Sequence, residues 1–160
     1  MTESALLRLH TETVQPDWVD YNGHMNVAYY VLVFDHATDA FLDQVGMNAA
    51  LRETTGSSVF VAEAHITYDQ EVMKGERVYI TTQLLAHDEK RLHIFHRMHR
   101  AEDDALVATN ELMILQVNLN DRRVGPFHES VRERIAVVAE QQAGLAVPDA
   151  AGRQIGIRRK

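Results

Sequence analysis

Cysteine is absent from this sequence of 160 residues. The absence excludes disulfides, thiolate nucleophiles and cysteine-ligated zinc sites together. The formal net charge is −7, so the chain also lacks the broad basic field that collects phosphates along a nucleic-acid backbone. We therefore expect no nucleic-acid partner, although a few local arginines can still bind a small phosphorylated ligand.

Long apolar segments are missing as well. No run approaches the roughly 18 apolar residues of a membrane span. The start of the chain, M-T-E-S-A-L-L-R-L-H, has neither the basic beginning nor the apolar core of a signal peptide. These features predict a soluble, cytoplasmic protein with no membrane partner.

Several catalytic motifs are also absent. The sequence has no G-x-S-x-G nucleophile elbow and no Walker A or Rossmann glycine pattern. His93, His96 and His99 invite a metal-site interpretation, but side chains alternate along a strand, so His96 faces away from the other two. We therefore assign no metal site and expect no cofactor.

The composition is that of a globular domain, 46% hydrophobic and 24% charged. Residues 26–45 contain no Gly or Pro and carry a wide apolar arc that includes Val27 and Val31. The polar side holds three aspartates at i, i+4 spacing, Asp35, Asp39 and Asp43. This pattern predicts a long, largely buried helix that ends at Gly46.

After a short helix expected over residues 47–54, a period of two replaces the helical period. Strands are predicted at residues 6–14, 59–68, 78–84, 91–100 and 106–119. Short turns such as Lys74-Gly75 indicate an antiparallel meander. An amphipathic helix is expected to begin at Pro126. Together these elements predict one α+β domain over residues 1–142, followed by a tail, residues 143–160, that is expected to be disordered.

The segment D-W-V-D-Y-N-G-H-M-N, residues 17–26, stands directly before the long helix. It brings the carboxylate of Asp20 and the Asn22-Gly23 turn to the place where helical N–H groups lack intrahelical partners. Such N–H groups can stabilise a developing oxyanion, while the carboxylate attacks a carbonyl or activates water. The same residue types also build an ordinary capping turn, so the local sequence leaves both interpretations open.

The stretch D-Y-N-G-H-M-N, followed by V-A-Y-Y, resembles the D-x-x-G-H-x-N-x-x-x-Y motif of hotdog-fold acyl-CoA thioesterases of the 4-hydroxybenzoyl-CoA thioesterase type. The resemblance covers about residues 6–140. Three stretches, W-V-D-Y-N-G-H-M-N, A-T-D-A-F-L and H-D-E-K-R-L-H-I-F-H, are together most similar to the betainyl-CoA thioesterases of carnitine degradation. The resemblance implies a hotdog fold, with a long central helix wrapped by an antiparallel sheet. It also implies a homodimer or tetramer with active sites at the subunit interface, and hydrolysis of a small acyl-CoA, with betainyl-CoA expected first.

The resemblance also implies roles for the loop. Asp20 matches the family's catalytic carboxylate, which acts as nucleophile or general base. Gly23, His24 and Met25 match the loop and helix start whose backbone N–H groups polarise the thioester carbonyl. Asn26 matches the asparagine that braces this loop.

Trp18 departs from the family pattern, because many members carry an acidic residue two positions before the catalytic aspartate. A trimethylammonium acyl group has a fixed positive charge, which aromatic faces attract. We therefore predict that Trp18, with Tyr21 or Tyr30, forms part of the acyl pocket.

Other charged residues supply further candidates. Glu63, on a strand expected to run beside the helix, is either a second active-site carboxylate or a salt-bridged strand residue. The cations expected to bind the CoA phosphates are Lys90, Arg91, Arg97 and Arg100.

Two other functions fit the same resemblance. One is a non-catalytic acyl-CoA-binding hotdog module, which would not need a carboxylate such as Asp20 beside the carbonyl. The other is a thioesterase for a different short-chain or aromatic acyl-CoA. A hotdog hydratase is disfavoured, because the sequence lacks a D-x-x-x-x-H loop on the central helix.

Overall fold

The computed structural model describes residues 5–159. Residues 1–4 and residue 160, the last of the predicted tail, lie outside the described part. The elements follow in the order β1 (Leu7–Thr13), η2 (Pro16–Trp18), α1 (Val27–Gln44), α2 (Ala49–Thr55), β2 (Ser57–Tyr68), β3 (Arg77–His87), β4 (Arg91–Arg100), β5 (Leu106–Asn118), β6 (Arg123–Val124) and α3 (Glu129–Gln142). The long helix, the short helix and the five main strands lie where the sequence predicts them. The 3-10 turn η2 and the two-residue strand β6 were not predicted.

The strands form one antiparallel sheet in the order β1-β3-β4-β5-β2, and β6 pairs with the last two residues of β5, Val117 and Asn118. The expected meander therefore holds for β3, β4 and β5, but it is wrong for β2. Eight residues, 69–76, connect β2 to β3, which is longer than a tight hairpin turn. Val72 in this connection is fully buried, so the segment crosses the end of the domain and leaves β2 as an edge strand.

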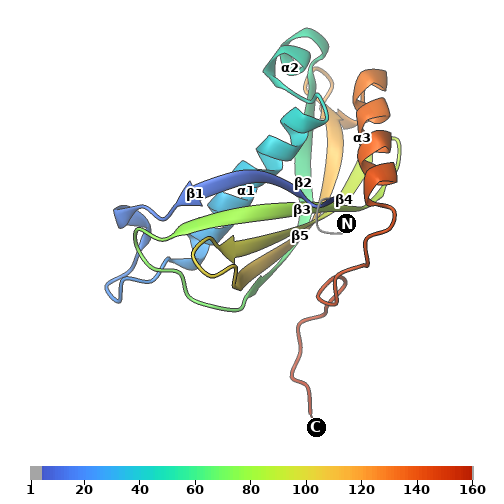
Figure 1. Cartoon of the computed structure of the whole chain (residues 1–160). Helices are drawn as coiled ribbons and strands as arrows, with labels where there is room; N and C mark the ends of the chain where they lie inside the picture. Colours follow the sequence, from blue (N-terminus) through green and yellow to red (C-terminus); the bar gives the residue numbers. More distant parts are fainter. Residues whose placement is uncertain (1–4, 160) are drawn as a thin grey trace.

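Helix α1 lies across the concave face of the curled sheet (Figure 1). Asn26 caps its start, because the Asn26 side-chain oxygen accepts a hydrogen bond from the N–H of Ala28 at 3.0 Å. Gly46 follows its end with a φ of +85°, which a residue with a Cβ adopts at a cost. The helix thus begins and ends where the sequence predicts.

The buried side of α1 faces the sheet, and the three predicted aspartates are on its exposed side. Val27 and Val31 are 57% and 42% exposed, so the expected burial of the whole apolar arc is wrong for this part of the helix. They lie on the side of α1 next to the edge strand β2, beyond which the sheet does not continue. An apolar strip therefore stays open along this edge.

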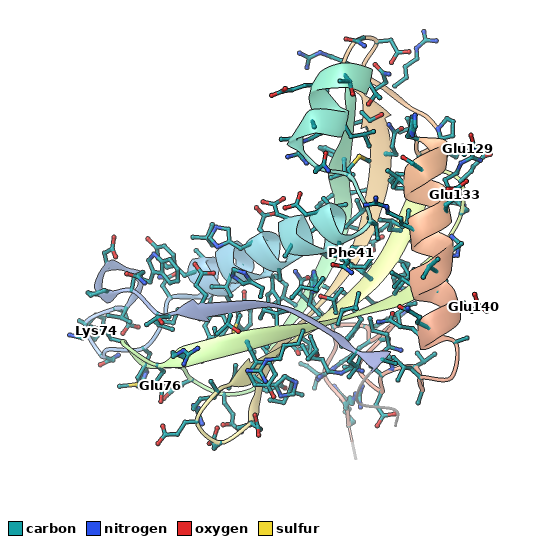
Figure 2. All side chains as sticks on the ribbon, turned by 45° about the horizontal axis from the view of Figure 1, so that its top comes forward. Phe41, Lys74, Glu76, Glu129, Glu133 and Glu140 are labelled. Carbon is teal, nitrogen blue, oxygen red and sulfur yellow. The ribbon has the colours of Figure 1, made fainter. Side chains whose placement is uncertain are left out.

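Helix α3 packs into the same core as the C-terminal half of α1. Val131 and Ile135 join Phe41 in one hydrophobic cluster. Figure 2 shows Phe41 on the sheet side of α1, with Glu129, Glu133 and Glu140 on the exposed side of α3. The helix begins three residues after Pro126, because His128 supplies the cap by accepting a hydrogen bond from the N–H of Ser130 at 3.3 Å.

The C-terminal segment beyond residue 142 contains neither helix nor strand in its described part. It contacts the convex face of the sheet, where Gln83 donates to the carbonyl of Ala146 at 3.1 Å and the N–H of Gly152 donates to Glu111 at 2.7 Å. This face is thus partly covered by the chain's own end. Among the described residues, no helix combines the length and the apolar character needed to cross a bilayer.

Candidate active site

The loop before α1 is held against the connection between β2 and β3. The N–H of Met25 donates to the carbonyl of Val72 at 2.8 Å, and an isolated bridge pairs His24 with Met73. The His24 ring also lies 3.1 Å from the Glu71 carboxylate. These contacts fix the loop at the N-terminal end of α1. This is the place where the sequence predicts that residues 17–26 bring a carboxylate and free N–H groups together.

Asp20 is exposed at the tip of this loop. Its Oδ1 accepts hydrogen bonds from the N–H groups of Asn22, at 2.8 Å, and His24, at 3.3 Å. The backbone of Gly23 closes the turn with a φ of +78° and an N–H bond to the Asp20 carbonyl at 2.9 Å. Among the described residues, Oδ2 has no hydrogen-bond partner, so one carboxylate oxygen is held by the loop and the other is available to a reactant.

The backbone N–H groups assigned to the thioester carbonyl are mostly engaged inside the loop. Gly23 donates to the Asp20 carbonyl, Met25 to Val72, and Asn26 to the Trp18 carbonyl at 2.9 Å. His24 makes the long bond to Asp20 Oδ1. The N–H groups of Gly23 and Met25 therefore already have partners in this chain, and their role as donors to the thioester stays a prediction.

Val27 carries an N–H group at the helix start that the sequence interpretation did not consider. It is the first residue of α1, and its N–H has no partner among the described residues, while the next two, Ala28 and Tyr29, donate to Asn26. The signal was present in the sequence, because a capping asparagine satisfies the N–H groups that follow the first helical position and leaves the first one free. The free N–H lies at the positive end of the helix dipole.

The three predicted aromatic residues do not form one cage within a single chain. The Trp18 ring stacks on Tyr29, with 5.4 Å between centroids and 11° between planes. Tyr30 is buried in the core, where its hydroxyl donates to the Gln70 carbonyl at 3.1 Å and burial raises its pKa. Tyr21 is 97% exposed beside Asp20. The structure therefore pairs Trp18 with Tyr29, a residue not assigned to the site from the sequence.

Glu63 does not join Asp20 in the same chain. Its neighbours Val61 and Ala64 line the side of β2 that faces α1, whereas Glu63 lines a cavity of about 360 Å³ with residues of the opposite, convex face. A register shift between Val61 and Glu63 accounts for this change of face. A role for Glu63 next to Asp20 would need a second subunit.

Three of the four cations assigned to CoA lie along β4, and Lys90 directly precedes this strand. Arg91 and Arg100 lie at opposite ends of this ten-residue strand, about 30 Å apart at the usual rise per residue. Arg91 pairs with Asp88, and Arg100 pairs with Asp103 at 2.9 Å. These two arginines cannot hold the same phosphate, and Lys90 lies beside Arg91 at one end.

Arg97 differs from the other three cations. It lies half-buried on the convex face, donates from Nη2 to Gln83 at 3.1 Å, and has no partner at Nη1 among the described residues. Burial lowers the pKa of this guanidinium. The unpartnered Nη1 is buried in the single chain, so an anion could reach it only after the surrounding residues move.

The three strand histidines do not converge, as predicted. His96 is buried between the hydroxyls of Thr38 and Thr82, each 2.9 Å from a ring nitrogen. His93 lies on the convex face, 2.7 Å from Glu111, and His99 stacks on Tyr79. The structure does bring three other ligand-type residues together, and they are described below.

A groove of about 410 Å³ runs between α1 and β2. It starts at Ala28, next to the free N–H of Val27, and continues past Val31 and Val61. Asn110 also lines it, and the buried Oδ1 of this side chain has no partner among the described residues. The groove thus places an apolar, acyl-sized space beside the Asp20 loop.

The long helix crossing a curled antiparallel sheet is the hotdog fold. The Thioesterase-like superfamily model matches residues 14–135, and the chain belongs to this family.

Individual relatives agree with this assignment. The chain is 42% identical over 154 residues to the betainyl-CoA thioesterase of Pseudomonas aeruginosa, covering 96% of this chain and 97% of that protein. It is 39% identical to the L-carnitine dehydrogenase/betainyl-CoA thioesterase of Rhizobium meliloti, covering 98% of this chain but only 31% of that longer protein. A Staphylococcus aureus protein solved in complex with CoA superposes with a TM-score of 0.89 at 32% identity, over 96% of this chain and 97% of that one.

Proposed function

We propose that this protein hydrolyses an acyl-CoA thioester to the free acid and CoA, and that betainyl-CoA is its substrate. One observation carries the proposal. Among residues 5–159, one carboxylate oxygen of Asp20 has no hydrogen-bond partner, and the first N–H of α1, that of Val27, is also free at the same junction of loop and helix. The choice of betainyl as the acyl group is based on the sequence similarity to a betainyl-CoA thioesterase.

The two groups divide the chemistry between them. The Val27 N–H donates to the carbonyl oxygen of the thioester and stabilises the negative charge that develops there. Asp20 acts either as the nucleophile, through an acyl-enzyme anhydride, or as the general base that takes a proton from water. In both routes water supplies the hydroxyl of the product acid, the C–S bond breaks, and the CoA sulfur leaves as a thiolate that takes up a proton.

We infer that a second copy of the chain closes the site, as a homodimer or within a tetramer. In the single chain Asp20, Tyr21 and Val27 are exposed, and an open site weakens the electrostatic stabilisation that the reaction needs. The edge strand β2 exposes Phe60 and Tyr68, at 60% and 46%. Long apolar edge strands pair with other chains unless they are blocked, so a partner on β2 would cover the neighbouring loop as well.

Trp18 is the proposed determinant of the acyl group. Trp18 stands two positions before Asp20, the proposed catalytic carboxylate. Its ring is held in place by stacking on the ring of Tyr29. A trimethylammonium group on an aromatic face gains about 0.5–2 kcal/mol. We also propose that the protein is cytoplasmic, as the sequence predicts.

The experiment is a panel of acyl-CoA substrates, with betainyl-, acetyl- and benzoyl-CoA, followed by release of free thiol. The readout is clean because the protein has no cysteine of its own. We expect rapid hydrolysis of betainyl-CoA and a loss of about 10²–10⁴-fold in Asp20→Asn, whose side-chain oxygen can still accept the loop hydrogen bonds.

Asp17→Asn is the matched control, because Asp17 is an exposed carboxylate in the same loop and has no assigned role. If wild type releases thiol only at the buffer rate from every substrate while it binds CoA, the non-catalytic binding module is the correct function. If Asp20→Asn keeps wild-type activity, the protein is a thioesterase but Asp20 is not its catalytic carboxylate.

A further inference from the structure

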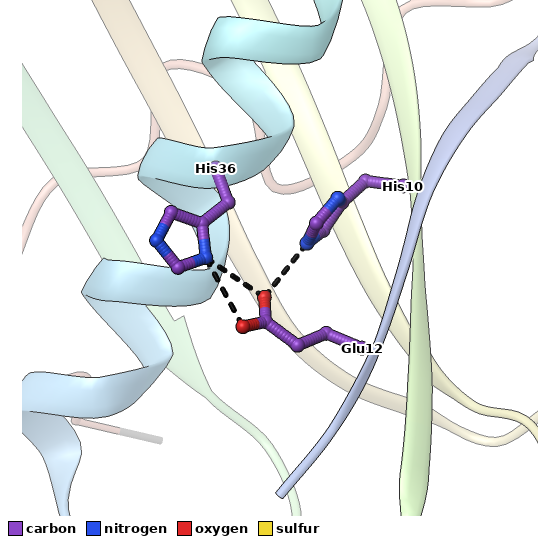
Figure 3. A group of neighbouring side chains, drawn as sticks. All are labelled: His10, Glu12 and His36. Atoms are coloured by element: carbon purple, nitrogen blue, oxygen red, sulfur yellow. Dashed lines mark hydrogen bonds and ion pairs between the residues drawn. The ribbon is translucent and has the colours of Figure 1, made fainter.

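Three ligand-type side chains meet away from the Asp20 loop, where β1 packs against α1 (Figure 3). The His10 Nε2 lies 2.7 Å from Glu12 Oε2, and the His36 Nδ1 lies 2.9 Å from the same oxygen. The His36 nitrogen also lies 3.1 Å from Glu12 Oε1. All three donor atoms are within 4.8 Å of one another.

The convergence follows from the two elements. His10 and Glu12 are two residues apart on β1, so both side chains point to the same face of the strand. That face contacts α1, which contributes His36 from its middle. The side chains are 22%, 19% and 37% exposed, so the site is partly withdrawn from water but can be reached from it.

We propose that His10, Glu12 and His36 form a binding site for a divalent transition-metal ion, with Zn²⁺ as the natural occupant. Two imidazoles and one carboxylate are a donor set that Zn²⁺ takes, with water in the fourth position. Other first-row ions such as Co²⁺ and Ni²⁺ bind the same nitrogen and oxygen donors.

The distances suit this ion after a small opening. Tetrahedral zinc with bonds of about 2.1 Å holds its ligand atoms about 3.4 Å apart. The present nitrogen–oxygen separations of 2.7 and 2.9 Å would therefore grow by roughly half an ångström, which side-chain rotation supplies. Each neutral imidazole would carry its proton on the other ring nitrogen, so the ion takes the place now occupied by N–H···O hydrogen bonds.

The surroundings also favour a cation. Asp35, Asp39 and Asp43 run along the exposed side of α1 next to His36. Asp39 follows His36 by three residues, so its side chain lies one turn further along the helix. A bound dication would be stabilised by this row of carboxylates.

The ion would join the edge strand β1 to the central helix. The N-terminal strand pairs with the sheet through β3 and is joined to α1 by the bonds between Glu12 and His36, so a metal ion would strengthen this second attachment. This role is structural and does not depend on the reaction proposed for Asp20.

The test is a titration of the full-length, tag-free and chelator-treated protein with ZnCl₂ by calorimetry. We expect one ion per chain and a thermal unfolding temperature that rises with zinc concentration, because a ligand that binds the native state alone stabilises it. Co²⁺ in place of Zn²⁺ gives visible absorption bands that report a site of low coordination number. Because the chain has no cysteine, only nitrogen and oxygen ligands can contribute to the spectrum.

His36→Gln and Glu12→Gln should each weaken zinc binding by more than about 100-fold, beyond the effect of losing an outer-shell partner. His87→Gln, which alters an exposed histidine outside the cluster, should bind zinc as wild type does. The proposal is overturned if wild type takes up no stoichiometric zinc, or if both cluster variants keep wild-type affinity and the same cobalt spectrum. If a cluster variant does not fold, His10→Gln and the wild-type cobalt spectrum still decide the question.

Discussion

The hydroxyl of Tyr68 donates a hydrogen bond to the carbonyl oxygen of Val27 at 3.4 Å. This contact joins the end of the exposed edge strand β2 to the first residue of α1, whose N–H is proposed to receive the thioester carbonyl. Tyr68 also packs edge-on against the ring of Tyr30, 5.2 Å away. The edge of β2 and the start of α1 thus form one surface, and a partner bound to β2 would reach the proposed reaction centre.

A charge on this edge should therefore separate subunits and reduce turnover together. Phe60→Lys places an ammonium group on the middle of β2, and lysine on an edge strand opposes strand pairing. We expect sedimentation velocity to show dimers or tetramers for wild type and monomers for the variant, with activity lost to the same extent as association. Val137→Lys is the matched control, because Val137 is 52% exposed on α3, away from β2. An active monomer would contradict the shared site.

Trp18→Ala should change the choice of substrate more than the rate of hydrolysis. Loss of the aromatic face should lower kcat/KM for betainyl-CoA by about 2- to 30-fold, which corresponds to 0.5–2 kcal/mol of cation–π attraction. Acetyl-CoA has no cationic group, so its kcat/KM should change little. Trp18→Phe keeps a ring on Tyr29 and should recover most of the preference. Equal losses for both substrates would mean that Trp18 only supports the loop.

Much of the fold could be predicted because local sequence determines it. The boundaries of α1 follow from the Asn26 cap and from Gly46, and β4 spans the ten residues that its alternation predicts. The position of β2 could not be predicted in this way. Strand order depends on contacts between distant segments, and the burial of Val72 in the connection is visible only in three dimensions.

The candidate site was predictable to the level of the loop and no further. The position of Asp20 before a capped helix can be read from the sequence, but the hydrogen bonds that occupy the N–H groups of Gly23 and Met25 depend on the fold. The face on which Glu63 lies depends on a bulge in β2. His36 is separated from Glu12 by 24 residues, so no local pattern connects it with β1.

Gly23→Ala tests whether the loop must keep its shape. The φ of +78° at Gly23 costs an L-residue roughly 1–2 kcal/mol, and relief of that strain would move Asp20, whose carbonyl accepts the Gly23 N–H. We expect kcat to fall at least about 10-fold while circular dichroism stays unchanged. Gly152→Ala carries similar strain, with a φ of +71°, but lies on the convex face and should leave kcat unaltered. Equal kcat values for the two variants would show that the loop tolerates displacement.

His96 should make the stability of the protein sensitive to acid. Burial lowers the pKa of His96 to about 3, whereas an unfolded histidine has a pKa near 6.5. Between these values the unfolded chain binds a proton that the folded chain excludes, so the contribution is fully present above about pH 6.5 and is lost as pH falls toward 3. The slope from this one group reaches about 1.4 kcal/mol per pH unit.

Replacing His96 should reduce this acid sensitivity at the expense of stability. His96→Gln leaves the hydroxyl of Thr82 without its ring partner and removes the stack on Phe34, so the free energy of unfolding at pH 7 should fall by about 1–3 kcal/mol. Urea unfolding at pH 7 and pH 5 should then give a smaller difference for the variant than for wild type. His87→Gln, at an exposed histidine, should keep the wild-type difference. A buried, neutral His96 must contribute to the acid sensitivity. If His96→Gln loses as much stability between pH 7 and pH 5 as wild type does, the acid sensitivity therefore comes from other groups.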